Sequence, residues 1–280
     1  MLKPSLLAVI VTAALTAGFA AQSAPVDEWR DCDAMGNDAP ARNRIIAGCT
    51  ARIESGEEKG DNLAAAYANR GEAQYGFDRF AEAASDYTSA LMLTPDDADI
   101  LYQRATAYAA LKRYDEAIAD FDRAIARKRN FAEALYNRGG TYFAKGAFER
   151  AIADFNTYLQ MRPRAADGYH ARALVRNATG ATIQALADLD RAVQLDANYA
   201  EAFYARAVMH LTAERDDKAI ADFNEAIRIK PDFAEAYRYR GAAYDRKGLS
   251  EQAISDYSAA IRIKPDYGGA YDSRGYEFLQ

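Results

Sequence analysis

The fold of this chain is decided by a 34-residue block that spans residues 132–165 and reads AEALYNRGGTYFAKGAFERAIADFNTYLQMRPRA. In its first half, Leu135, Arg138 and Tyr142 recur at the spacing of one helical face. A second set with the same spacing, around Phe155, follows a short glycine-containing turn. The block therefore predicts two antiparallel helices joined by a turn.

The same pattern recurs every 34 residues from residue 64 to the C-terminus, and such a period indicates a stack of identical supersecondary units. Repeat position 8 is always Gly or Ala and position 20 is always Ala, which lets the two helices of a unit approach closely. Aromatic residues cluster around positions 11, 17 and 24, and Pro often ends the second helix at position 32. The predicted units are 64–97, 98–131, 132–165, 166–199, 200–233, 234–267 and a half unit at 268–280.

These columns, seen for example in Gly139, Ala151 and Pro163, resemble the tetratricopeptide repeat family over residues 64–280. The resemblance implies an all-α superhelical solenoid of antiparallel helix pairs. It also implies that the first helix of each pair lines a concave groove. The carboxylate clamp of some family members is not expected, because it needs Lys where the first unit has Ala68.

Two repeat positions are always charged: position 7 is Arg in all seven units, and position 23 is Asp in all six full units. In an antiparallel hairpin these positions lie at the same height, so each Asp is predicted to lie between the Arg of its own unit and that of the next. Anion binding by the Arg column is the less favoured alternative, because the matched carboxylates neutralise it. The predicted structural ladder comprises Arg70, Arg104, Arg138, Arg172, Arg206, Arg240 and Arg274 with Asp86, Asp120, Asp154, Asp188, Asp222 and Asp256.

The fourth unit departs from the pattern. It has Arg176 and Thr182 where aromatic residues are expected, and Ala197 in place of Pro, so we expect it to be the least stable internal unit. At its junction with the third unit, Tyr158 replaces the usual Ala. Counting antiparallel heights places Tyr158 opposite Gly168, which predicts a large-for-small exchange across the junction.

The N-terminus predicts a secretory signal peptide at residues 1–20, because Lys3 precedes an uncharged apolar run from Leu6 to Ala21. Small residues permit cleavage after Ala20 or after Ser23. A retained membrane anchor is the alternative, but the run falls short of the roughly 20 residues that span a bilayer. The chain is therefore predicted to be exported, periplasmic or secreted, without stable membrane insertion after cleavage.

Residues 21–63 are predicted to form a capping segment with one helix, because residues 42–54 are amphipathic. Extending the repeat backward gives Cys49 position 20. The pair Cys32 and Cys49 predicts a disulfide in an exported chain, worth about 3 kcal/mol. Two unpaired thiols are the alternative.

Composition and motifs argue against several classes of function. A net charge of −6 disfavours nucleic-acid binding. The two histidines, His170 and His210, occupy positions 5 and 11 on different helix faces, so no shared metal or base site is predicted. No phosphate loop or nucleophile motif is present. We therefore expect no enzyme activity, no cofactor and no metal.

Positions 5, 6 and 12 vary between units and face away from the hairpin core, as recognition positions do. Aromatic rings beside side-chain amides suit an extended peptide. The alternative is that the position-5 rings only cover neighbouring helices. The predicted groove residues are Tyr102, Tyr136, His170 and Tyr204 at position 5, Asn69, Gln103 and Asn137 at position 6, and Tyr75 and Phe143 at position 12.

Together these features predict a noncatalytic exported scaffold or adaptor that binds a protein or an extended peptide in the groove. A glycan or cell-wall association module is the alternative, because tyrosine rings also stack on sugars. Self-association through the C-terminal half unit is a further predicted contact.

Overall fold

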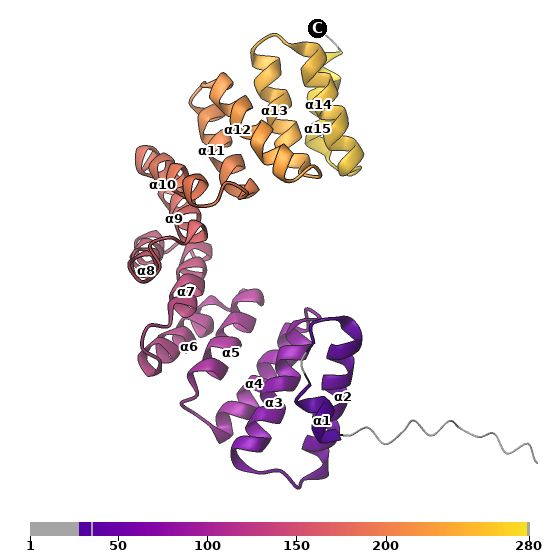
Figure 1. Cartoon of the computed structure of the whole chain (residues 1–280), viewed down its shortest axis with the longest axis vertical. Helices are drawn as coiled ribbons and strands as arrows, with labels where there is room; N and C mark the ends of the chain where they lie inside the picture. The colour runs from indigo at the N-terminus through magenta and orange to yellow at the C-terminus, as the bar shows by residue number, and fades with distance from the viewer. Residues whose placement is uncertain (1–27, 35, 279–280) are drawn as a thin grey trace, which may run out of the picture.

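The computed structural model describes residues 28–34 and 36–278, and every regular element in that part of the chain is an α-helix. The helices stack in chain order into an arc whose two ends curve toward the same side (Figure 1). This is the predicted all-α solenoid. The predicted signal peptide and its cleavage sites lie outside the described residues.

Each full unit forms one helical hairpin, and from the second unit onward the first helix begins at the first position of the predicted unit. The first helices are α3 (Gly60–Tyr75), α5 (Ala98–Ala110), α7 (Ala132–Ala144), α9 (Ala166–Ala178), α11 (Ala200–Thr212), α13 (Ala234–Arg246) and α15 (Gly268–Glu277). The second helices are α4 (Phe80–Leu93), α6 (Tyr114–Arg127), α8 (Phe148–Met161), α10 (Thr182–Leu195), α12 (Asp216–Ile229) and α14 (Ser250–Ile263).

The turn inside every hairpin has its residue at repeat position 15 in the left-handed backbone region, which ends the first helix. Three units have Gly there, for example Gly146 at φ 81°. The other three use Asp78, Lys112 and Glu214, at φ 57–59°. The backbone geometry of the turn is therefore constant although its sequence is not.

Contacts between the two helices of a unit explain why the residues at repeat positions 8 and 20 are small. Every position-20 alanine is fully buried. A Cβ atom at Gly241 would lie 2.7 Å from the ring of Tyr257, and one at Gly139 would lie 3.0 Å from the ring of Phe155. The aromatic residue at position 24 therefore packs directly on the backbone of position 8.

First helices of successive units adjoin one another, whereas second helices contact mainly the first helices on either side. In a curved stack the more closely spaced layer lies on the inside of the curve. The first helices therefore line the concave surface, as predicted. The exception is the pair α9 and α11, which contact each other less than the other neighbouring first helices do.

The charged ladder is present, but its predicted connectivity is wrong in one respect. In the six full units, the Nε and Nη2 atoms of the position-7 Arg donate to both oxygens of the Asp in the same unit, at 2.6–2.9 Å. The link to the preceding unit is made instead by Nη1, which reaches position 25, as from Arg138 to Asp122 at 2.6 Å. The Asp carboxylates are buried, and their hydrogen bonds raise the pKa of Arg70 and Arg104 despite burial.

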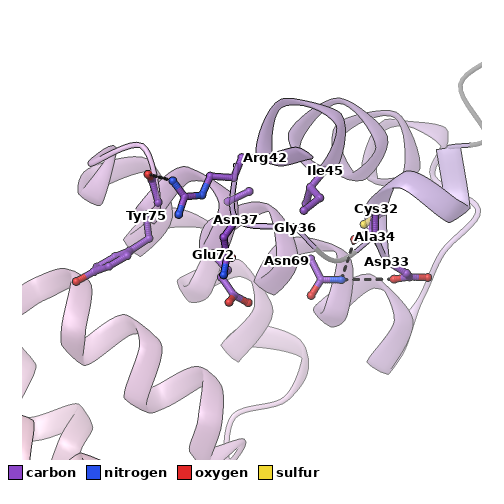
Figure 2. A pocket seen from close by; sticks show the side chains of 12 residues that line it. Cys32, Asp33, Ala34, Gly36, Asn37, Arg42, Ile45, Asn69, Glu72 and Tyr75 are labelled. Carbon is purple, nitrogen blue, oxygen red and sulfur yellow. Dashed lines mark hydrogen bonds between the residues drawn. The ribbon is translucent and has the colours of Figure 1, made fainter. Parts of the chain in front are cut away.

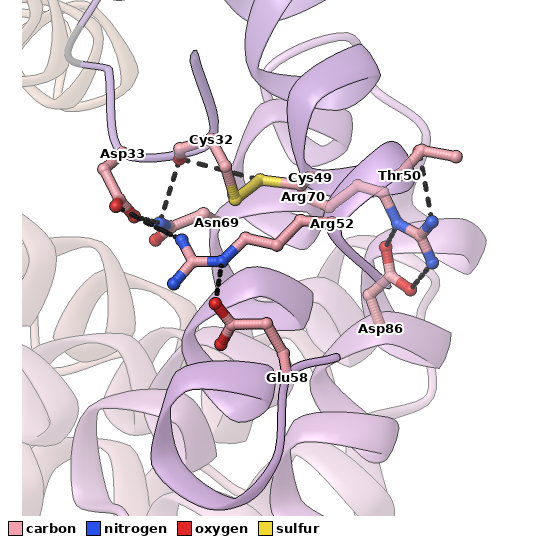
Figure 3. The surroundings of a disulfide bond; sticks show 9 residues. All are labelled: Cys32, Asp33, Cys49, Thr50, Arg52, Glu58, Asn69, Arg70 and Asp86. Atoms are coloured by element: carbon pink, nitrogen blue, oxygen red, sulfur yellow. Dashed lines mark hydrogen bonds and ion pairs between the residues drawn. A yellow bond between two sulfur atoms is a disulfide. The ribbon is translucent and has the colours of Figure 1, made fainter. Parts of the chain in front are cut away.

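The N-terminal cap contains two helices, α1 (Glu28–Cys32) and α2 (Ala39–Ser55), rather than the single helix predicted. The predicted disulfide joins Cys32 to Cys49 with a Cα–Cα distance of 4.5 Å, and ties α1 to α2 (Figure 3). Arg70 of the first unit donates to Thr50, which therefore occupies position 25 of the cap. Cys49 thus takes position 24, one helical turn from the predicted register, because α3 begins four residues earlier than Ala64.

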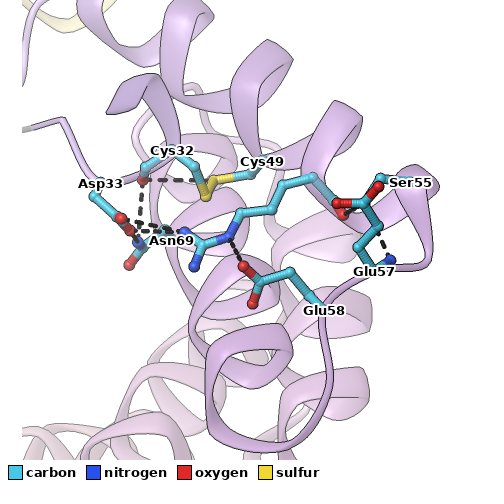
Figure 4. Close-up of polar contacts among 8 residues, drawn as sticks. Cys32, Asp33, Cys49, Ser55, Glu57, Glu58 and Asn69 are labelled. Carbon is cyan, nitrogen blue, oxygen red and sulfur yellow. Dashed lines mark hydrogen bonds and ion pairs between the residues drawn. A yellow bond between two sulfur atoms is a disulfide. The ribbon is translucent and has the colours of Figure 1, made fainter. Parts of the chain in front are cut away.

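A polar cluster holds the cap on the first unit (Figure 4). The Nε of Arg52 donates to Glu58 at 2.8 Å, and both side chains are buried. Arg52 also donates to Asp33 at 3.1 Å, and Asn69 on α3 donates to the carbonyl of Cys32 at 3.1 Å. Residues from α1, α2 and α3 are therefore fixed to one another.

Candidate functional site: the concave surface

The predicted position-5 side chains all lie on first helices and are half-buried. Tyr102 and Tyr204 each pack against the phenylalanine that ends their own unit. The ring centroid of Tyr102 lies 5.0 Å from that of Phe131, and the centroid of Tyr204 lies 4.8 Å from that of Phe233. These rings therefore do cover neighbouring helices, as the alternative interpretation held, while part of each side chain stays exposed.

Tyr136 packs against two rings on the second helix of its own unit, α8. Its centroid lies 5.6 Å from that of Phe155 and 5.1 Å from that of Tyr158. Burial, with a smaller effect from Asp167, raises the pKa of Tyr136. Replacing this residue would therefore change packing as well as the surface.

The predicted amides are partly used by the protein itself. Asn69 is bound to the cap, and Asn137 donates to the hydroxyl of Tyr102 at 2.9 Å. Gln103 lies half-buried on α5. Two of the three position-6 amides, Asn69 and Asn137, therefore connect their unit to the preceding unit or to the cap.

One cleft on this surface lies between α5 and α7 and has a volume of about 410 Å³. Its lining includes Tyr75, Tyr136 and Asn137, three of the predicted groove residues, with Phe121 at its base. Gly140 contributes an exposed stretch of helix backbone, and a Cβ atom there would meet nothing within 4 Å. The structure thus brings predicted residues from two units together around an open space.

A second cleft, between α9 and α11, has a volume of about 360 Å³ and includes His170 and Tyr204 from the predicted set. Most of its lining is apolar, and apart from Tyr204 these apolar residues were not predicted from the sequence. The available signal was Leu174, an apolar residue that is 39% exposed at a position where Thr106 and Gly140 stand in earlier units. The apolar lining comprises Ala173, Leu174, Leu189, Tyr204, Ala205, Val208, Met209 and Phe233.

A larger cavity of about 660 Å³ separates the cap from α3. Figure 2 shows Asn69 directed at Cys32 and Asp33 on one side, while Arg42 on α2 reaches the end of α3 on the other. Tyr75 lines this cavity as well as the α5–α7 cleft. Phe143, by contrast, packs on Phe148 in its own turn, with 6.0 Å between ring centroids.

The two histidines are held by different neighbours. His170 lies 2.9 Å from the hydroxyl of Tyr199 through Nδ1, and His210 lies 4.0 Å from Asp222 through Nε2. Burial lowers the pKa of both imidazoles. Across residues 28–34 and 36–278, no group of three His, Cys, Asp or Glu side chains is arranged to hold a metal ion.

No helix among residues 28–34 and 36–278 has both the length and the apolar character required to cross a membrane.

The hairpins, their stacking and the clefts between first helices define a helical repeat solenoid. Models of the tetratricopeptide repeat match residues 68–130, 102–167 and 234–267, and a model of the TPR repeat matches residues 213–248. Together these matches cover more than half of the chain. The chain therefore belongs to the tetratricopeptide repeat family. A comparison with curated proteins found no significant match.

Several solved structures share this architecture. A tetratricopeptide repeat protein from Parabacteroides merdae is 20% identical, with a TM-score of 0.68 over 85% of this chain and 93% of that chain. YrrB, described as a TPR protein with an unusual peptide-binding site, is 25% identical, with a TM-score of 0.53 over 69% of this chain and 99% of its own. MamA is 26% identical, with a TM-score of 0.53 over 57% of this chain and 94% of its own.

Proposed function

We propose that this protein is a noncatalytic, exported scaffold that binds a protein or an extended peptide on its concave surface. The observation that carries the proposal is the α5–α7 cleft, where half-exposed rings from the first and third units and an amide from the third surround an open space of about 410 Å³. Clefts of this size, lined by aromatic rings with a few polar groups, suit side chains of a ligand. The likeness to YrrB, which has a peptide-binding site, supports a peptide over other ligands.

Export is supported by the sequence of the first 20 residues and by the disulfide of the cap. Disulfides persist in oxidising compartments and are rare in the cytosol. Self-association through the C-terminal half unit is a separate proposal, supported by the exposed rings of Tyr271, Tyr276 and Phe278 on or next to α15.

Gly140 offers a sharp test, because its position on α7 faces open space within the cleft. Gly140→Gln fills the cleft with a polar side chain and stabilises the helix by up to about 1 kcal/mol. Ala153→Gln, at an exposed position on the second helix of the same unit, is the matched control. Binding is measured on an immobilised peptide array and in a polysaccharide pull-down.

We expect peptide binding that Gly140→Gln abolishes and Ala153→Gln leaves intact. Retention on polysaccharide without peptide binding would overturn the proposal in favour of a glycan-binding module. Equal peptide binding by both variants and the unmodified protein would place the ligand away from this cleft and would also overturn it.

A further inference from the structure

The fourth unit lacks the aromatic pair that fills the inner surface of its neighbours. In the second, third and fifth units, a position-5 tyrosine packs on a position-24 phenylalanine, as Tyr102 does on Phe121 at 6.0 Å between centroids. In the fourth unit these positions are His170 and Leu189. Both side chains are smaller than those they replace, and the ring of His170 is held by Tyr199, 5.1 Å away between centroids.

The α9–α11 cleft lies at this site, where the two first helices also contact each other least. Leu189 at its base is buried, whereas Leu174 at its edge is exposed to solvent. Covering an exposed leucine and the apolar cleft beside it with an apolar group of a ligand removes apolar surface from water and so stabilises the complex. The cleft therefore has the size and chemistry to receive an apolar side chain.

The charge beside this cleft also differs from that of the other units. In four units an acid at position 2 pairs with a cation at position 31: Asp99 with Lys128, Glu133 with Arg162, Glu201 with Lys230 and Glu235 with Lys264. In the fourth unit the corresponding residues are Asp167 and Asp196, so an acid stands in place of the cation.

Three carboxylates consequently gather near the Tyr199–His170 edge of the cleft. Burial first, and then charges that include Asp167, Glu201 and Asp196, raise the pKa of Tyr199. Glu201 lines the cleft itself, and its pair with Lys230, at 3.4 Å, is exposed. Asp167 accepts hydrogen bonds from the Tyr158 hydroxyl and its neighbouring amide rather than from a cation. A positively charged ligand group is therefore favoured at this edge.

We propose that the α9–α11 cleft binds one apolar side chain of a partner peptide, and that Asp167, Asp196 and Glu201 bind a lysine or arginine next to it. This assignment rests on the function proposed above and adds the chemistry of the partner. The partner segment is proposed to carry an apolar residue next to a basic residue, because Glu201 lines the cleft together with His170, and His170 contacts Tyr199.

Two variants introduce residues that other units have at the same repeat positions, so both are designed to preserve the fold. His170→Tyr with Leu189→Phe recreates the ring pair of the second unit and fills the cleft. Asp196→Lys recreates the cation of position 31 next to Asp167. Glu149→Lys, at an exposed site on α8, makes the same change of charge away from the cleft and is the control. Thermal unfolding of each variant verifies that it is folded.

The probes are short synthetic peptides that carry Leu, Phe or Ser at one position and Lys or Glu at the next, with binding followed by fluorescence anisotropy. We expect the Leu-Lys and Phe-Lys peptides to bind roughly tenfold or more tightly than the Ser and Glu versions. The double variant should remove the preference for the apolar residue. Asp196→Lys should remove the preference for Lys, which should also weaken with added salt, whereas Glu149→Lys should retain it.

If both cleft variants keep the preferences of the unmodified protein while Gly140→Gln still abolishes binding, the concave surface binds peptides but this assignment is wrong. If affinity does not depend on the apolar or the basic residue, the assignment is likewise overturned. If no peptide binds to the unmodified protein, both this assignment and the proposed function fail. Should the double variant be unfolded, Asp196→Lys and the peptide series still decide the question.

Discussion

The ring of Tyr158 occupies the space that a side chain at residue 168 would need. A Cβ atom at Gly168 would lie 2.6 Å from Cε1 and 2.7 Å from Cδ1 of that ring, and 2.9 Å from Leu159. The preceding junction has Ala124 and Ala134 at the same two repeat positions. The predicted large-for-small exchange between the third and fourth units is therefore confirmed.

This contact predicts a strong coupling between the two residues. Gly168→Ala should destabilise the protein by about 1–3 kcal/mol, because the buried ring cannot move away easily. Tyr158→Ala should cost about 3–5 kcal/mol through the cavity that it leaves. The double variant recreates the alanine pair of the other junction, so its cost should fall short of the sum by at least about 0.5 kcal/mol in urea unfolding. Additive effects would show that the contact carries no coupling.

The two carboxylates bound to Arg138 should contribute very unequally to stability. Asp154 is buried, and Asp154→Ala would leave a largely buried guanidinium without its bidentate partner, at a cost of about 3–5 kcal/mol. The side chain of Asp122 is 52% exposed, and Asp122→Ala should cost less than about 1 kcal/mol. Urea unfolding at low salt compares the two. Equal small losses would mean that the ladder behaves as a solvated surface.

The disulfide should stabilise the cap locally. Mass measured after alkylation, with and without reductant, should show Cys32 and Cys49 joined in exported material. Both cysteines are buried, and the stability of a repeat array is approximately a sum of local terms, so reduction should raise hydrogen exchange mainly at residues 28–56. Residues 200–267 are the internal reference. Two freely alkylated thiols in unreduced native protein would disprove the pairing, and loss of protection throughout would disprove its local effect.

The fourth unit should exchange fastest among the internal units. Its position-5 and position-24 side chains do not form a ring pair, and α9 and α11 contact each other less than neighbouring first helices do elsewhere. Fewer packed contacts lower the free energy of local opening. Hydrogen exchange read by mass spectrometry should show lower protection over residues 166–199 than over 132–165 or 200–233. Uniform protection across these units would contradict the prediction.

His210 should make the protein sensitive to mild acid. Its Nδ1 is buried without a hydrogen-bond partner, and burial lowers the pKa of the imidazole in the folded state. The unfolded state then binds a proton more readily, so this contribution to stability is complete above about pH 6.5 and declines as the pH falls toward the folded pKa. His210→Tyr, which matches Tyr244 in the next unit, should reduce the loss of urea stability between about pH 7 and pH 5. An unchanged pH profile would exclude His210 as its source.

The sequence by itself determined the repeat, the positions of the hairpins, the burial of the small residues at repeat positions 8 and 20, and the pairing of Arg and Asp within a unit. These features follow from local periodicity, because every unit repeats the same short-range contacts. The sequence also predicts that Tyr158 lies opposite Gly168, because residues in two antiparallel helices can be matched by counting from the turn that joins them.

Only the tertiary structure decided how units connect and where space remains. The Nη1 of Arg138 reaches Asp122 instead of sharing the neighbouring Asp, and Cys49 is shifted by one turn because α3 begins early. The use of Asn69 and Asn137 inside the protein and the opening between α9 and α11 likewise depend on contacts between units. Such contacts are set by the distance and rotation of one hairpin against the next, which the periodicity of a single unit does not contain.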